Sequence, residues 1–106
     1  MTLRVVLCTA PPDEAARLAR EVVGRRLAAC VNIVPGLRSI YRWKGEICDD
    51  AESLMVIKTR EDRVASLTEA LLELHAYDTP EVIALPIEEG AGNPAYLQWL
   101  MDESAG

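Results

Sequence analysis

The stretch ACVNIVPGLRSIYRWKGEICDDAESLMVIKTR, residues 29–60, decides the fold. It is typical of two long β-strands that meet at a turn around Lys44-Gly45. At about 3.3 Å per residue each strand extends roughly 45 to 50 Å, far beyond a usual strand. Pro35-Gly36 interrupts the alternation of the first strand, as a bulge or bend does. The sequence therefore predicts a long β-hairpin whose outer half is redirected by the bend.

The outer half of this hairpin carries apolar side chains that one small chain has no spare helix to cover. They are Ile40, Tyr41, Trp43 and Ile47. An uncovered apolar ribbon with open edges favours association. We therefore expect the hairpin to pack on other subunits.

The rest of the chain supplies the partners of this hairpin in a single sheet. It predicts a strand at Leu3 to Thr9, a helix from Asp13-Glu14 with an apolar stripe to Leu27, a helix over Val64 to Leu74 capped by Thr59 or Asp62, a strand at Glu81 to Ile87 and a last helix from Asn93-Pro94. A polar break is expected in the third strand at Asp49-Asp50. This order predicts an α+β, ferredoxin-like βαββαβ antiparallel sheet with an extra C-terminal helix and a long extended β-hairpin. Residues 1–106 form one domain, with both crossover helices on one face.

Composition excludes several classes of partner. The net charge is −6, whereas nucleic-acid and anionic-membrane binding both draw on basic clusters. No run approaches the roughly 20 apolar residues of a membrane span, and the first residues are typical of a strand rather than of a signal segment, so we expect none. Cys8, Cys30 and Cys48 form an odd set without CxxC spacing, which favours reduced thiols. We expect a cytoplasmic protein with no nucleic-acid or membrane partner.

The predicted topology gathers the candidate chemistry at one end of the sheet. That end contains Cys8, Thr9, His75, Tyr77, Asp78 and Glu81. A thiolate, an imidazole and carboxylates are ligand types for copper, zinc and other divalent cations. Two alternatives stay open: His75 satisfying carbonyls at a helix C-terminus, and Cys8 as an inert core thiol. No orienting group or oxyanion site accompanies the Cys8-His75 pair, so we expect no enzyme.

The hairpin offers two weaker candidates for a ligand site. Tyr41 and Trp43 share one face of the strand and either line a cleft or anchor a subunit contact. Arg38, Arg42 and Lys44 lie on the other side and either hold an anion between subunits or are solvated charge.

Taken together, the chain resembles the CutA family of divalent-cation tolerance proteins. The motifs that carry the resemblance are VLCTAP at 6–11, RLAACVNIVPG at 26–36, SIYRWKG at 39–45, IKTR at 57–60, HAYDTPE at 75–81, ALPI at 84–87 and NPAYLQWL at 93–100. Their joint order spans essentially the whole chain.

The resemblance implies a non-enzymatic homotrimer with long hairpins packed between neighbours, similar to PII signalling proteins. It also implies tolerance of copper and other divalent cations, with Cys8 and His75 as metal ligands. Leu74 stands where some relatives have a second histidine, and Ala76 replaces the usual proline. Weaker copper binding is therefore expected, or completion by Asp78, Glu81 or another subunit. The alternative is a PII-like regulator that binds a small anion or nucleotide in intersubunit clefts.

Overall fold

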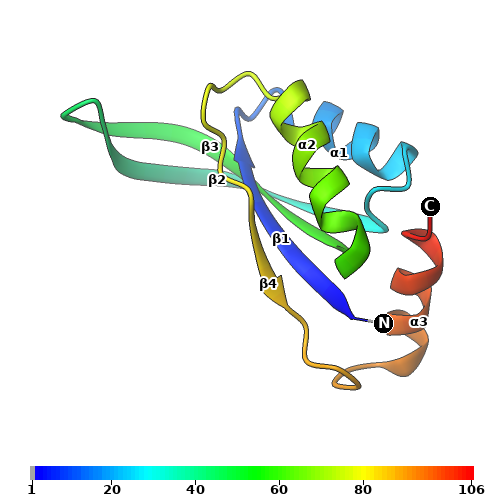
Figure 1. The fold of residues 1–106 in the computed structure, drawn as a ribbon. Coiled ribbons are helices and arrows are strands. Elements are labelled where there is room, and N and C mark those ends of the chain that lie inside the picture. The colour runs from blue at the N-terminus through cyan, green and yellow to red at the C-terminus, as the bar shows by residue number, and fades with distance from the viewer. Residues whose placement is uncertain (1) are drawn as a thin grey trace.

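Four strands and three helices alternate along the computed structural model, which describes residues 2–106. They are β1 (Leu3–Ala10), α1 (Ala15–Gly24), β2 (Cys30–Trp43), β3 (Glu46–Arg60), α2 (Val64–Leu74), β4 (Ile83–Pro86) and α3 (Pro94–Glu103), with a short 3₁₀ helix at Glu61–Arg63. The strands form one antiparallel sheet in the order β2-β3-β1-β4 (Figure 1). This is the ferredoxin-like order, which confirms the predicted fold class.

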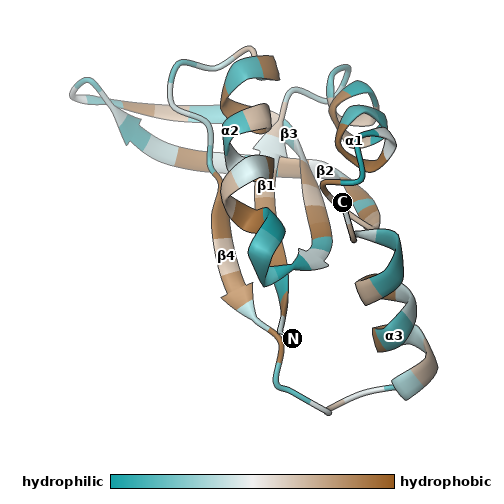
Figure 2. Ribbon diagram, turned by 45° about the vertical axis from the view of Figure 1, so that its right-hand side comes forward, coloured by the Kyte–Doolittle hydropathy of each residue, from teal (hydrophilic) through white to brown (hydrophobic). Residues whose placement is uncertain are grey.

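Helices α1 and α2 cover one face of the sheet and build the main core with it. Alternate residues of β1 point into this core, among them Val6 and Cys8. Leu18 from α1 and Leu71 from α2 meet them there, and both are fully buried. In Figure 2 hydrophobic segments run along the strands, while α1 and α2 alternate hydrophobic and hydrophilic residues.

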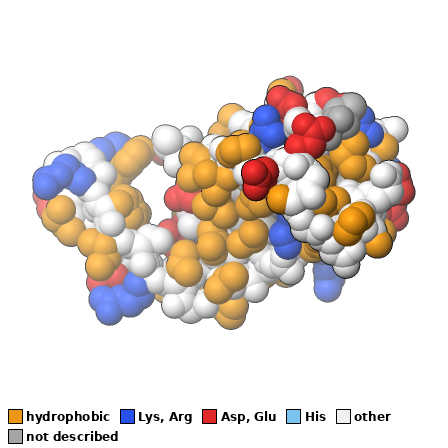
Figure 3. Space-filling view, turned by 90° about the horizontal axis from the view of Figure 1, so that it is seen from below, with side chains coloured by type: hydrophobic (Ala, Val, Ile, Leu, Met, Phe, Trp, Pro, Cys, Tyr) orange, Lys and Arg blue, Asp and Glu red, His pale blue; other side chains and the backbone are white. Residues whose placement is uncertain are grey.

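The opposite face of the sheet is also apolar, but only α3 packs on it, at one end, where Leu100 is buried against Leu3 and Ala29. Ile83 of β4 lies opposite Leu7 of β1, and Leu7 lies opposite Val56 of β3. Leu85 and Val5 form the next row. Figure 3 shows hydrophobic side chains gathered over the underside of the view in Figure 1. An antiparallel sheet that faces water on one side normally carries polar residues there, so this face is unusual for an isolated chain.

The hairpin of β2 and β3 projects from the body as an arm (Figure 1), and the molecule measures 44 × 25 × 21 Å. Its two-residue turn has positive φ at Lys44 (51°) and Gly45 (82°), the conformation that matches the twist of a tight hairpin. The strand register shifts between Val34 and Leu37. The predicted turn and the predicted bulge at Pro35-Gly36 are therefore both confirmed.

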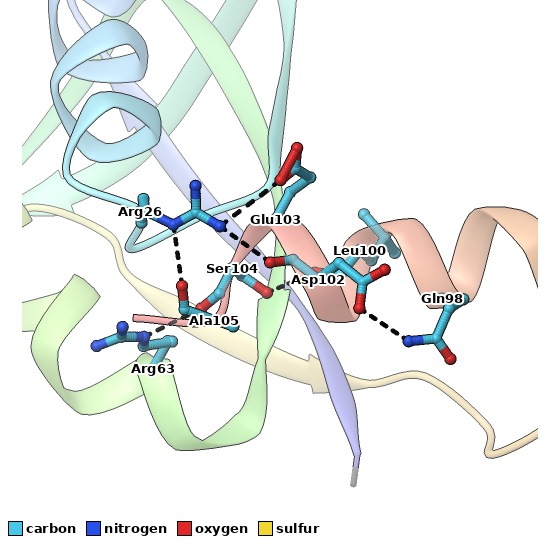
Figure 4. Close-up of polar contacts among 8 residues, drawn as sticks. All are labelled: Arg26, Arg63, Gln98, Leu100, Asp102, Glu103, Ser104 and Ala105. Atoms are coloured by element: carbon cyan, nitrogen blue, oxygen red, sulfur yellow. Dashed lines mark hydrogen bonds and ion pairs between the residues drawn. The ribbon is translucent and has the colours of Figure 1, made fainter.

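The C-terminal helix is fixed at both ends. Asn93, at the predicted start of this helix, caps it by accepting a hydrogen bond from the amide of Ala95 (3.0 Å). At its other end, Arg26 donates to the carbonyls of Asp102 and Ala105, and Arg63 donates to that of Ser104, each at 3.0 Å (Figure 4). Two arginines thus satisfy the carbonyls that a helix end leaves free.

Several local predictions were wrong. Helix α1 ends at Gly24, so Leu27 packs on the core from the following loop. The start of α2 has no side-chain cap. Thr59 instead donates to the carbonyl of Leu27 (2.7 Å), and Asp62 pairs with Arg60 (2.8 Å).

Two strand boundaries also differ from the expectation. β3 runs through Asp49-Asp50 without a break, because that segment stays paired with β2. β4 begins at Ile83 rather than Glu81 and pairs with β1 along one edge only, which tolerates Pro86. Among the described residues, the longest and most apolar helices still fall short of what a membrane crossing requires.

Candidate functional site

The predicted gathering of residues at one end of the sheet is present. β1 ends there at Ala10, the segment after α2 passes over it, and the base of the arm borders it. Thr9, Tyr77, Asp78 and Glu81 all line one pocket at this end. Antiparallel topology produces this arrangement, because β1 ends where β2 passes from the body into the arm and β3 returns from it.

His75 is held by the backbone through both ring nitrogens. It ends α2, and its amide donates to the carbonyl of Leu71 (2.9 Å). The amide of Tyr77 donates to Nδ1 (3.1 Å), which makes Nδ1 an acceptor. Nε2 lies 2.8 Å from the carbonyl oxygen of Thr9, so Nε2 carries the proton and donates. The ring is therefore the neutral Nε2–H tautomer, and it ties the end of α2 to β1.

Cys8 lies just behind this contact, in the core. Its side chain is fully buried, and Sγ is 3.7 Å from the carbonyl oxygen of Thr9. Burial, followed by the carboxylates of Glu81 and Glu52, raises the pKa of Cys8 from 9.0 to about 12. At neutral pH the group is a protonated thiol.

The structure therefore brings the two predicted metal ligands to the same backbone oxygen. The sulfur of Cys8 and Nε2 of His75 both contact the carbonyl of Thr9. Copper takes thiolate and imidazole, so the residue types fit. The state of the residues does not, since the thiol is protonated and both imidazole nitrogens are occupied. Within residues 2–106 no three His, Cys, Asp or Glu side chains converge as a metal site.

Asp78 and Glu81, the predicted completing ligands, line a separate open pocket. Its volume is about 660 Å³, and it lies between the base of the arm and the segment after α2. The lining comprises Thr9, Ser39, Ile40, Tyr41, Trp43, Glu52, Ala76, Tyr77, Asp78, Thr79 and Glu81. Tyr41 and Trp43 were expected either to line a cleft or to anchor a subunit contact. In the structure both side chains line this pocket.

The pocket contains one acid that sequence reasoning missed. Glu52 is buried, and its Oε2 accepts a hydrogen bond from the hydroxyl of Tyr77 (2.8 Å). Burial, followed by this carboxylate, raises the pKa of Tyr77. The Tyr41 hydroxyl donates likewise to Asp50, which raises the pKa of Tyr41 to about 12. Two phenols thus remain protonated donors to carboxylates. Only the alternation of β3 marked Glu52, and its pairing with Tyr77 has no local signal.

The basic residues of the arm are not part of the pocket lining, although the Lys44 ammonium lies 5.9 Å from the centroid of the Trp43 ring. Arg38 instead pairs with Asp49, its neighbour across the arm (3.2 Å from Nε), and neither Arg42 nor Lys44 is among the lining residues. Cys48 lies in the arm, and Cys30 starts β2 at the opposite end of the sheet. The three thiols are free and far apart in the topology.

These observations define a class: a small ferredoxin-like protein with two helices on one sheet face, an apolar and largely uncovered second face, and a projecting hairpin beside a polar pocket. The chain belongs to the CutA1 family, because the family model described as "CutA1 divalent ion tolerance protein" matches residues 4–103. This confirms the resemblance seen in the sequence.

Individual relatives carry the same family name. The chain is 52% identical to the divalent-cation tolerance protein CutA of Thermus thermophilus over 101 residues, 94% of this chain and 96% of that one. Some plant relatives are longer: the chain covers 56% of the chloroplastic CutA 1 of Oryza sativa, at 52% identity over 94% of this chain.

Solved structures extend the likeness to the fold. The CutA1 crystal structure from Oryza sativa superposes with a TM-score of 0.94 at 47% identity, covering 99% of this chain and 95% of that one. The PII-like protein CutA from Nostoc sp. PCC 7120, in its apo form, gives 0.90 at 32% identity, covering 96% and 97%.

Proposed function

We propose that this protein is a non-enzymatic homotrimer that binds divalent cations, copper foremost, where Cys8 and His75 meet. The observation that carries the metal proposal is the shared contact of both side chains with the Thr9 carbonyl. The names of its relatives, divalent-cation tolerance proteins, support the same function. Free thiols throughout fit a reducing, cytoplasmic location.

Copper binding at this place requires a local opening. The thiolate is the metal-binding form of cysteine, so Cys8 has to release its proton. One nitrogen of His75 has to leave its backbone partner. Both steps cost free energy, so the affinity is lower than that of a prearranged site, and binding releases a proton.

The trimer proposal rests on the uncovered apolar surface. Ile40 and Ile47 are 68% and 64% exposed on the arm, although isoleucine is among the residue types most often buried. The chain exposes 6322 Å², against about 5,900 Å² for a compact monomer of its mass. The apolar sheet face opposite α1 and α2 is a second exposed apolar surface, on which Ile83 and Leu85 are 51% and 46% exposed. A second and third copy of the chain supply the cover that one subunit lacks.

A copper titration tests the metal proposal directly. We expect copper(I), delivered under reducing conditions against a competing chelator, to bind the wild-type chain, with affinity lowered by roughly tenfold or more in His75→Ala and in Cys8→Ser. Cys48→Ser, which changes a thiol in the arm, is the matched control and keeps wild-type affinity. Unchanged affinity in His75→Ala removes the proposed site.

A second function is favoured by the pocket of about 660 Å³, a volume in the range of small-molecule sites. On this reading the protein is a PII-like regulator that binds a small ligand at the base of the arm, and the metal is incidental. The Nostoc relative is itself described as PII-like.

A further inference from the structure

The pocket at the base of the arm has an unbalanced negative charge. Three carboxylates line it, those of Glu52, Asp78 and Glu81, and its described lining includes no lysine or arginine. Across residues 2–106, the ion pairs that form leave these three acids without a basic partner. Their field reaches the core, since Glu81 and Glu52 add to burial in raising the pKa of Cys8. A small anion or a nucleotide would be repelled here.

Aromatic rings form another part of the wall. Tyr41, Trp43 and Tyr77 line the pocket. The ammonium group of Lys44 lies 5.9 Å from the centroid of the Trp43 ring, so this ring already attracts a cation. Aromatic faces beside carboxylates are the surroundings that stabilise a positively charged nitrogen carried on an apolar body.

Thr9 adds a polar group to the wall of the pocket. Thr9 is only 8% exposed and lines the pocket, and its hydroxyl has no hydrogen-bond partner among residues 2–106. Every fully buried side-chain nitrogen or oxygen in this part of the chain has one. The Thr9 hydroxyl is therefore open to the pocket, and it is an unused donor and acceptor at its inner end.

The volume of the pocket and the arrangement of its carboxylates favour an organic ligand over a bare metal ion. The volume of about 660 Å³ suits a small organic molecule. The carboxylates do not converge as a metal-binding group in the described chain. We propose that this pocket binds an organic cation, an amine whose charged nitrogen lies among Glu52, Asp78 and Glu81 and whose apolar part packs on the aromatic rings. The inference rests on the second function above, and names the class of its ligand.

Calorimetry with three probes of one shape tests the sign of the ligand charge. Benzylamine, benzyl alcohol and benzoate share a ring and differ mainly in charge. We expect benzylamine to bind once per chain, benzyl alcohol to bind about tenfold more weakly, and benzoate not to bind. Benzoate binding as tightly as benzylamine overturns the organic cation but leaves a small-molecule regulator standing. Absence of binding by all three overturns both.

Two sets of variants locate the site. Glu81→Gln and Glu52→Gln remove charge from the lining and should weaken benzylamine binding about fivefold to tenfold. Thr9→Val should weaken it less. Glu73→Gln, an equal charge change on the exposed side of α2, is the control. Equal weakening by Glu73→Gln would contradict the assignment. One-to-one displacement of benzylamine by magnesium chloride would assign the pocket to a metal ion instead. Copper affinity, measured separately, bears only on Cys8 and His75.

Discussion

The two halves of β3 show how differently the same strand can be supported. In the body, Met55 and Ile57 are fully buried under α1 and α2. In the arm, the same strand runs from Glu46 to Ala51 with Ile47 64% exposed. Both halves pair with β2 along their length. Both halves of β3 therefore form β-structure with β2, but helices of the same chain pack only against the inner half.

The body and the arm therefore differ in how much stabilisation they gain from burying apolar side chains. Full burial of an apolar side chain stabilises by about 1.5–3 kcal/mol relative to exposure. The body gains this free energy within one chain. In the proposed trimer the arm gains it only when another copy packs on Ile40 and Ile47, so the stability of the arm is expected to depend on protein concentration.

The largest effect is expected from truncating the body core. Leu71→Ala should lower the free energy of unfolding by about 3 kcal/mol, because a fully buried leucine leaves a cavity. Leu72→Ala is the matched control, one position further along α2, where the side chain is 53% exposed. It should cost well under 1 kcal/mol. Urea unfolding measures both, and similar losses would show that the helical layer is not the closed core described here.

A smaller effect is expected on the pH dependence of stability, where Cys8 in the body should differ from Cys48 in the arm. The pKa of Cys8 is raised from 9.0 to about 12, so the unfolded chain loses this proton first as the pH rises. Ionisation then favours unfolding, and the free energy of unfolding should fall between pH 9 and 12 by about 1.4 kcal/mol per unit from this group. Below pH 9 its contribution is constant.

Substitution isolates that contribution. Cys8→Ala should be less stable at neutral pH but should lose less stability between pH 9 and 12 than the wild type, in unfolding curves recorded across that range. Cys48→Ala, which removes a thiol from the arm, should keep the wild-type slope. An unchanged slope in Cys8→Ala would show that the thiol is not shielded as the structure indicates.

The regular features of the fold were readable from sequence because each has a local cause. Alternation marked the long strands, Lys44-Gly45 marked the tight turn, and Pro35-Gly36 marked the shift in register. The order of elements and the handedness of crossovers then fixed the topology. These signals also placed Cys8 and His75 at one end of the sheet.

The chemistry of that end was less readable, because it depends on contacts between distant segments. The contact of His75 with the Thr9 carbonyl spans 66 residues, and the Tyr77–Glu52 hydrogen bond spans 25. Such pairs are set by sheet register and by the path of the segment after α2. The sequence predicted that His75 satisfies a carbonyl at the end of its helix. In the structure its ring satisfies a backbone carbonyl, but that carbonyl belongs to Thr9 of β1.

Mass in solution tests the central claim, that the arm and the open sheet face are covered by further copies of the chain. Analytical ultracentrifugation of the wild-type protein should give about three times the chain mass of 11.7 kDa. The double variant Ile40→Asp, Ile47→Asp should sediment as a smaller species, since it places charge on the surface that we propose neighbouring copies cover. A folded wild-type protein that stays at 11.7 kDa as concentration rises would contradict the account.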